Sequence, residues 1–75
     1  LHYNGRGIKR DLARAAALFR KAAEAGDASA QNVLASMYQE GKGVPFDPAR
    51  AARWYEKAAR QGDAQAQFNL GNLYR

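Results

Sequence analysis

The chain has 75 residues and a formal net charge of +5, from twelve basic and seven acidic side chains. A chain of this length supports one small domain, in which folding buries only about 60% of the unfolded surface. It has no cysteine, which excludes disulfides and thiolate metal sites and leaves the cellular compartment open. No run of about 18 apolar residues occurs, so we expect no membrane-spanning helix.

The chain is expected to begin with a helix end and a new helix. Residues 1–4 read as a last helical turn, and Gly5–Gly7 as the loop that ends it, because glycine accepts the positive φ of a helix terminus. Ile8 is expected to form a small apolar plug, and Asp11 to cap the next helix. That helix, over 11–24, has a wide apolar face made of Leu12, Ala15, Ala16, Leu18, Phe19, Ala22 and Ala23.

A second helix, from about Ala28 to Gln39, follows with almost no linker. Gly26 ends the first helix and Asp27 caps the second, so the two must fold back as an antiparallel hairpin. The inward stripe of the second helix is Ala30, Leu34, Met37 and Tyr38.

Asp47-Pro48 is the clearest helix start in the chain, after a loop over 41–46. The third helix runs to about Arg60 and is expected to bury Ala51, Ala52, Tyr55, Ala58 and Ala59, with Trp54 partly buried. Gly62 and Asp63 repeat the hairpin turn. The last helix, over 64–74, is expected to bury Ala66, Leu70, Leu73 and Tyr74, and Gly71 to allow a close helix approach.

The two halves of the chain repeat each other with an offset of thirty-six residues. Residues 5–26, GRGIKRDLARAAALFRKAAEAG, match residues 41–62, GKGVPFDPARAARWYEKAARQG, at both loop glycines, the capping aspartate and the alanine pairs. The identities continue through Asp27/Asp63, Gln31/Gln67, Leu34/Leu70 and Tyr38/Tyr74. A fixed period of this length indicates stacked helix pairs. Because residues 1–7 already align with 37–43, we expect no signal peptide here and a longer parent array, truncated at both ends.

Three segments carry a family resemblance. They are Ala-x-Ala-Gln-x-x-Leu-Gly-x-x-Tyr at 64–74, Gly-x-Gly-Val at 41–44, and Asp-x-x-x-Ala-x-x-Trp-Tyr-x-x-Ala-Ala-x-x-Gly at 47–62. Together they resemble the Sel1-like repeat, a relative of the tetratricopeptide repeat. The chain departs from that pattern where Ala35 replaces a helix glycine, Leu18-Phe19 replaces Trp-Tyr, and His2 occupies a tyrosine position.

The resemblance implies an all-α fold, a right-handed α-solenoid of antiparallel helix pairs, here with four helices. It divides residues 1–75 into repeats at about 1–26, 27–62 and 63–75. Members of the family usually act as adaptors or scaffolds in protein assemblies, often in bacterial signalling, envelope or host-interaction roles. A subset with inter-repeat disulfides is linked to β-lactam binding, and a chain without cysteine is a poor match to that subset.

Catalytic and metal chemistry find little support in the residues. His2 is the only histidine, so no set of nucleophile, base and orienting group can be assembled. The acids fall at helix starts or singly on surfaces, and no cluster of metal ligands is visible. Gly41-Lys42-Gly43 lacks the spacing of phosphate loops and indicates a helix end. We expect a protein that is not an enzyme and needs no cofactor or metal.

The surface is expected to be more basic than the net charge suggests, because four of the acids are placed as helix caps. The exposed cations form what we call the basic face: Arg14, Lys21, Arg50, Arg53, Lys57 and Arg60. It is either a solvated outer helix face or a surface for an acidic partner. Nucleic acid is disfavoured, because Trp54 and Tyr55 belong to the apolar side of their helix and leave no interleaved free aromatics.

In stacked helix pairs the first helix of each unit lines the concave side. The positions there that packing leaves free carry amides, hydroxyls and one aromatic ring. We call them the concave face: Ser29, Asn32, Ser36, Gln39, Gln65, Phe68, Asn69 and Asn72. This chemistry suits an extended peptide or protein segment. The alternative is a plain polar helix face, and Asn69 also belongs to the family's own pattern.

We therefore expect a protein–protein interaction or scaffold module that binds a protein or peptide segment on its concave face. The alternative is electrostatic binding of an acidic partner or polyanion through the basic face, which salt would weaken steeply. A regulatory region of a larger enzyme is a third interpretation. Further repeats are expected to pack on both ends, and the alanine-rich core predicts marginal stability for the chain alone. Localisation stays open between the bacterial envelope and the cytoplasm.

Overall fold

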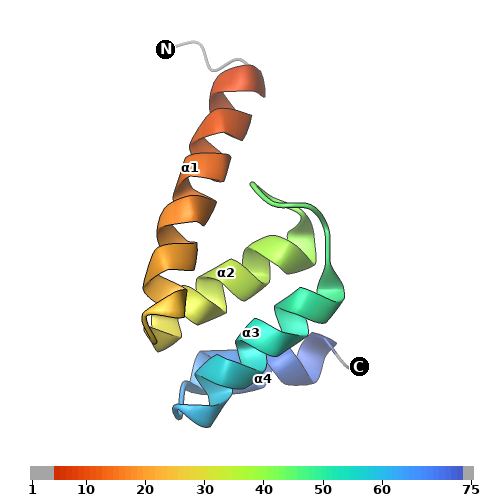
Figure 1. The fold of residues 1–75 in the computed structure, drawn as a ribbon. Helices are drawn as coiled ribbons and strands as arrows, with labels where there is room; N and C mark the ends of the chain where they lie inside the picture. Colours follow the sequence, from red (N-terminus) through yellow and green to blue (C-terminus); the bar gives the residue numbers. More distant parts are fainter. Residues whose placement is uncertain (1–4, 74–75) are drawn as a thin grey trace.

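The computed structural model describes the backbone of residues 5–73 and the side chains of residues 11–73. This part of the chain forms four helices: α1 (Gly5–Glu24), α2 (Ala28–Glu40), α3 (Pro48–Arg60) and α4 (Ala64–Leu73). Each helix packs against the next along the chain, and Figure 1 shows them as successive rods that fold back on one another. The described residues thus confirm the all-α solenoid of helix pairs.

The two hairpin turns use the same hydrogen bonds. Gly26 and Asp27 donate their backbone N–H groups to carbonyl oxygens in the last turn of α1, at 3.0 and 3.1 Å. Gly62 and Asp63 do the same to α3, at 2.9 and 3.2 Å. Each aspartate side chain then accepts the backbone N–H three residues further on, at 3.0 Å for Asp27 and 2.9 Å for Asp63. One residue therefore closes a helix and also starts the next.

The loop between α2 and α3 returns toward α1. Asp47 caps α3 by accepting from the backbone N–H of Arg50 at 3.1 Å, and Pro48 occupies the first turn, as the sequence predicts. Gly43 has a φ of 75° and lies so close to α1 that a Cβ there would collide with the carbonyl oxygen of Leu12. The loop therefore contacts the preceding unit as well as joining its own two helices (Figure 1).

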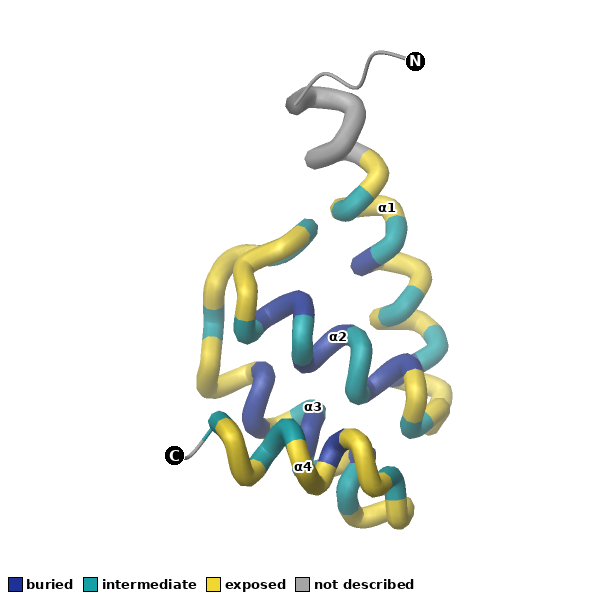
Figure 2. Tube along the Cα trace, turned by 180° about the vertical axis from the view of Figure 1, so that it is seen from behind, coloured by how far each residue is buried: buried dark blue, intermediate teal, exposed yellow. Residues whose placement is uncertain are grey.

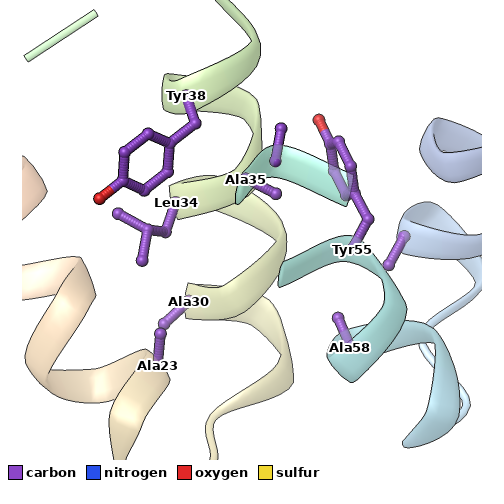
Figure 3. Packing of buried hydrophobic residues seen from close by; sticks show 9 residues of the cluster. Ala23, Ala30, Leu34, Ala35, Tyr38, Tyr55 and Ala58 are labelled. Atoms are coloured by element: carbon purple, nitrogen blue, oxygen red, sulfur yellow. The ribbon is translucent and has the colours of Figure 1, made fainter. Parts of the chain in front are cut away.

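The core runs between neighbouring helices and consists mostly of alanine: Ala23, Ala30, Leu34, Ala35, Tyr38, Ala51, Tyr55, Ala58 and Ala66. The whole predicted stripe of α2 is buried, and buried positions continue onto α3 (Figure 2). Leu34 and Tyr38 lie on the side of α2 toward α1, whereas Tyr55 of α3 packs on the other side (Figure 3). Methyl groups let the helices approach closely, and Leu34, Tyr38 and Tyr55 are the larger side chains of this core.

The first half of α1 differs from the prediction. Gly5–Gly7 were expected to form a loop and Asp11 a cap, but α1 is a continuous helix from Gly5, with Asp11 in its interior. The equivalent loop before α3 is held by the backbone of α1, and no described element holds residues 5–7 in that way. A helix then satisfies their backbone groups internally. The predicted turn at 1–4, the Ile8 plug and the burial of Tyr74 fall outside what the structure describes.

Two predicted packing roles are wrong. Leu18 is 68% exposed, although Trp54 at the equivalent place in α3 is partly buried. The reason is that α3 packs between α2 and α4, whereas α1 packs mainly against α2 and keeps one flank uncovered. A Cβ added at Gly71 would meet no described atom within 4 Å, so this glycine serves no close approach.

Candidate functional site

Three amides of the concave face are tied into the fold. Asn69 Nδ2 on α4 donates to Asn32 Oδ1 on α2 at 3.0 Å. Tyr55 on α3 donates its hydroxyl to Gln39 Oε1 at 2.9 Å. Burial raises the pKa of Tyr55, so its phenol remains a donor at neutral pH. These bonds hold α2 against both following helices and leave the three amides half-buried.

The remaining members of the concave face are more open. Ser36 is half-buried, whereas Ser29, Gln65, Phe68 and Asn72 are exposed. Phe68 keeps 66% of its surface accessible, which makes it one of three large apolar side chains exposed in the described chain, with Leu18 and Phe46. The predicted site therefore divides into three parts: an amide bridge between Asn32 and Asn69, the half-buried Ser36 and Gln39, and an exposed set that includes one aromatic ring.

All six members of the basic face are exposed. Four residues on α3, namely Arg50, Arg53, Trp54 and Lys57, line an open hollow of about 270 Å³. The ammonium group of Lys57 lies 4.7 Å from the centre of a Trp54 ring, in cation–π geometry. Arg14 and Lys21 stand on α1, which packs against α2, so the predicted stripe spans two separate helices.

Sequence reasoning missed two residues that the structure brings together. Tyr38 was expected to serve only the core, yet its hydroxyl oxygen accepts from Arg20 Nη2 at 3.2 Å and from Arg50 Nη1 at 3.5 Å. Arg20 was not part of the predicted basic face. The repeat alignment marks Arg20 as unusual, because the equivalent residue of the next repeat, Glu56, has the opposite charge.

Other site types are not found in the part of the chain that the structure describes. Within residues 5–73 no group of three or more His, Cys, Asp or Glu side chains is placed to hold a metal ion. None of the described helices has the length and apolar character needed to span a membrane.

Comparison with known families gives a match along the whole chain. The model of the Sel1 repeat matches residues 1–27, 28–63 and 64–75. Comparison with individual curated proteins finds no match. Sel1 repeats generally mediate protein–protein interaction, and proteins built from them are typically non-catalytic. With three consecutive repeats matched and the helix pairs in place, the chain belongs to the Sel1 repeat family.

Proposed function

We propose that this chain is a non-catalytic interaction module that binds a protein or peptide segment on the concave face formed by α2 and α4. The observation that carries the proposal is the 66% exposure of Phe68 on α4, the helix that also carries Gln65, Asn69 and Asn72. An exposed aromatic ring on a face that also carries amides and hydroxyls has the composition of a recognition surface, in which the ring supplies most of the binding energy and the polar groups fix orientation.

The amide bridge supports the same proposal. Asn69 and Asn32 hold α4 and α2 in a fixed relation through a 3.0 Å hydrogen bond, so Phe68 projects from a positioned helix. A preorganised surface loses less conformational entropy when a partner binds. We therefore assign Phe68 the role of anchor, Asn32 and Asn69 that of positioning residues, and Ser29, Ser36, Gln39, Gln65 and Asn72 that of polar contacts.

The test compares two phenylalanines of similar exposure. Phe46 is 68% exposed in the α2–α3 loop and serves as the matched control for Phe68. Each variant is tagged, used to co-purify partners from the native source, and compared with the unchanged chain by quantitative mass spectrometry. Phe68→Ala should lower recovery of the specific partner at least about tenfold, as expected for an aromatic anchor, while Phe46→Ala should leave it unchanged.

Asn32→Ala completes the test, because it removes the bridge without touching the ring. We expect it to weaken binding by a smaller factor than Phe68→Ala. Recovery of the same partner at the same level by both Phe68→Ala and Asn32→Ala would refute the concave-face proposal.

A second candidate function is binding of an acidic partner or polyanion through the basic face. The hollow on α3, lined by Arg50, Arg53, Trp54 and Lys57, is the observation that favours it. Salt distinguishes the two candidates. A polyanion held by several cations should lose affinity steeply between low and physiological salt, whereas a partner anchored on Phe68 should lose little.

A further inference from the structure

Two arginines from different helices donate hydrogen bonds to the hydroxyl group of Tyr38. Its ring is buried, with 3% of its surface accessible, and its hydroxyl points away from α3 and toward α1 (Figure 3). Arg20 reaches this oxygen from α1 and Arg50 reaches it from α3. The guanidinium carbon of Arg50 also lies 5.8 Å from the centre of the Tyr38 ring. Three helices thus meet at one phenolic oxygen, with two positive charges directed at it.

An open cavity lies over this meeting point. It has a volume of about 540 Å³ and is lined on one side by three alanines of α1, Ala13, Ala16 and Ala17. On the other side it is lined by Gly43–Pro45 of the α2–α3 loop. The alanines leave room where longer side chains would fill the space, and the loop lies close against α1 at Gly43. We call this cavity, together with Arg20, Tyr38 and Arg50, the arginine pocket.

The charges of the arginine pocket do not balance. Its charged lining residues are two cations, Arg20 and Arg50, and one anion, Asp47. Asp47 Oδ2 lies 3.4 Å from Arg50 Nε and offsets that charge. Glu24 of α1 acts on Arg20 from outside the lining. Among the lining residues the surplus therefore amounts to one positive charge, on the Arg20 side. Burial disfavours ionisation of Tyr38, but its hydrogen bonds to Arg20 and Arg50 and their positive charges outweigh that effect and lower the pKa of Tyr38.

We propose that the arginine pocket binds one carboxylate side chain of an acidic peptide. A guanidinium group has five N–H donors, and the bond from Arg20 to Tyr38 uses one of them, so a carboxylate can accept a bidentate pair from Arg20. A single negative charge neutralises the surplus, whereas a doubly charged phosphoryl group would leave an excess of negative charge beside Asp47. The alanine floor accommodates the peptide backbone on either side of the carboxylate. This pocket lies on the α1 side of α2 and does not include Phe68 or any other concave-face residue.

The experiment measures binding of short blocked peptides to the 75-residue chain by isothermal titration calorimetry at low salt. The peptides carry one central glutamate, glutamine or phosphoserine in the same alanine-glycine sequence. We expect the glutamate peptide to bind at least about tenfold more tightly than the glutamine peptide, because a charge-assisted bidentate pair is lost. The phosphoserine peptide should bind more weakly than the glutamate peptide.

Matched substitutions on the same helices locate the site. Arg20→Gln and Arg50→Gln should each abolish the preference for glutamate. Arg14→Gln on α1 and Arg53→Gln on α3 remove the same charge outside the pocket and should preserve it. Phe68→Ala should also preserve it, which separates failure of this proposal from failure of the concave-face proposal. Far-ultraviolet circular dichroism verifies that every variant keeps its helix content.

A second measurement does not depend on any substitution. In the unchanged chain, the glutamate peptide should shift the NMR resonances of the Tyr38 ring and of the Arg20 side chain, and the glutamine peptide should not. The proposal is overturned if glutamate and glutamine peptides bind equally, if Arg20→Gln keeps the preference, or if the Tyr38 resonances do not move. Tighter binding of the phosphoserine peptide would overturn the choice of a carboxylate.

Discussion

Gln31 and Gln67 occupy equivalent positions in the repeat but lie in different environments. Gln31 is 4% exposed, donates Nε2 to the carbonyl oxygen of Ala23 at 3.0 Å, and accepts from Gln61 Nε2 at 3.0 Å. Gln67, one repeat later, makes the equivalent bond to Ala59 at 3.2 Å but is exposed. The repeat alignment identifies these two glutamines as equivalent. Their burial depends on which helices cover each of them, and the alignment does not contain that information.

The two glutamines therefore form a matched pair for stability. Gln31→Met should lower the free energy of unfolding by about 1–2 kcal/mol, because it removes one buried and one partly buried hydrogen bond while keeping the side-chain length. Gln67→Met should cost less than about 0.5 kcal/mol, because water replaces the lost bond. Urea denaturation followed by circular dichroism measures both. Equal losses would show that the burial of Gln31 adds nothing.

Tyr38 and Tyr55 lie in the same core but differ in their charged neighbours. The pKa of Tyr38 is lowered from its ordinary value of 10.0, because two arginines outweigh the effect of burial. Burial raises the pKa of Tyr55 above 10.0. A tyrosine whose pKa is lowered on folding stabilises the chain above its unfolded pKa, and this contribution is lost as pH falls through the folded value. Tyr55 has the opposite sign, since its contribution is present below its unfolded pKa and lost as pH rises through the folded one.

These signs can be checked by spectrophotometric titration of the phenolate. Subtracting the Tyr38→Phe curve from that of the unchanged chain should isolate a titration below pH 10.0, and the Tyr55→Phe difference one above it. Arg20→Gln should move the Tyr38 midpoint upward. A Tyr38 midpoint above that of Tyr55 would contradict the hydrogen bonds that place two guanidinium groups on its oxygen.

The α2–α3 loop is the element that connects one repeat with the previous one. The sequence indicates a helix end at Gly41–Gly43, and Gly43 does have a left-handed φ of 75°. It does not indicate that the same glycine abuts the Leu12 carbonyl of α1, because that contact depends on how two helix pairs stack. Gly26 has a φ of 103°, but a Cβ at this glycine would have no described atom within 4 Å, so the two glycines differ mainly in crowding.

Alanine substitutions at these two glycines should separate strain from collision. Gly26→Ala should cost about 1–2 kcal/mol of unfolding free energy, the strain of a left-handed alanine. Gly43→Ala should cost more, because the loop must also move away from α1, and hydrogen exchange in the first half of α1 should speed up. Urea denaturation with exchange mass spectrometry tests this. If Gly43→Ala lowers the free energy of unfolding less than Gly26→Ala does, the loop does not lie against α1.

At the scale of the molecule, the period predicted the row of helices and the capping role of Asp27, Asp47 and Asp63. Those features follow from local chemistry, since a cap needs only the next turn of its own helix. The continuous start of α1, the exposure of Leu18 and the meeting of Arg20 with Tyr38 were not predictable in that way. Each depends on which neighbour covers a helix, and identical repeat positions have different neighbours in the structure.

The alanine core sets an expectation for the whole chain. A buried methyl contributes about 0.8 kcal/mol, so the six core alanines together contribute about 5 kcal/mol, comparable with Leu34, Tyr38 and Tyr55 at about 1.5–3 kcal/mol each, and the core is small. We expect the 75-residue chain to melt below about 60 °C, and a chain with an additional copy of residues 28–63 to melt at a higher temperature, because each added unit adds an interface. Thermal unfolding followed by circular dichroism measures both melting temperatures. A melting temperature unchanged by the added repeat would refute nearest-neighbour stabilisation.

The hairpin turns contain no spare linker residues, because Asp27 and Asp63 each bond the end of one helix and cap the start of the next. An epitope or tag spliced in beside either aspartate would uncouple a helix stop from the start that follows it. The bond between Pro45 and Phe46 joins two exposed residues outside both hairpin turns, so foreign sequence grafted there would spare these two aspartates but would disturb the loop that lines the arginine pocket and contacts α1.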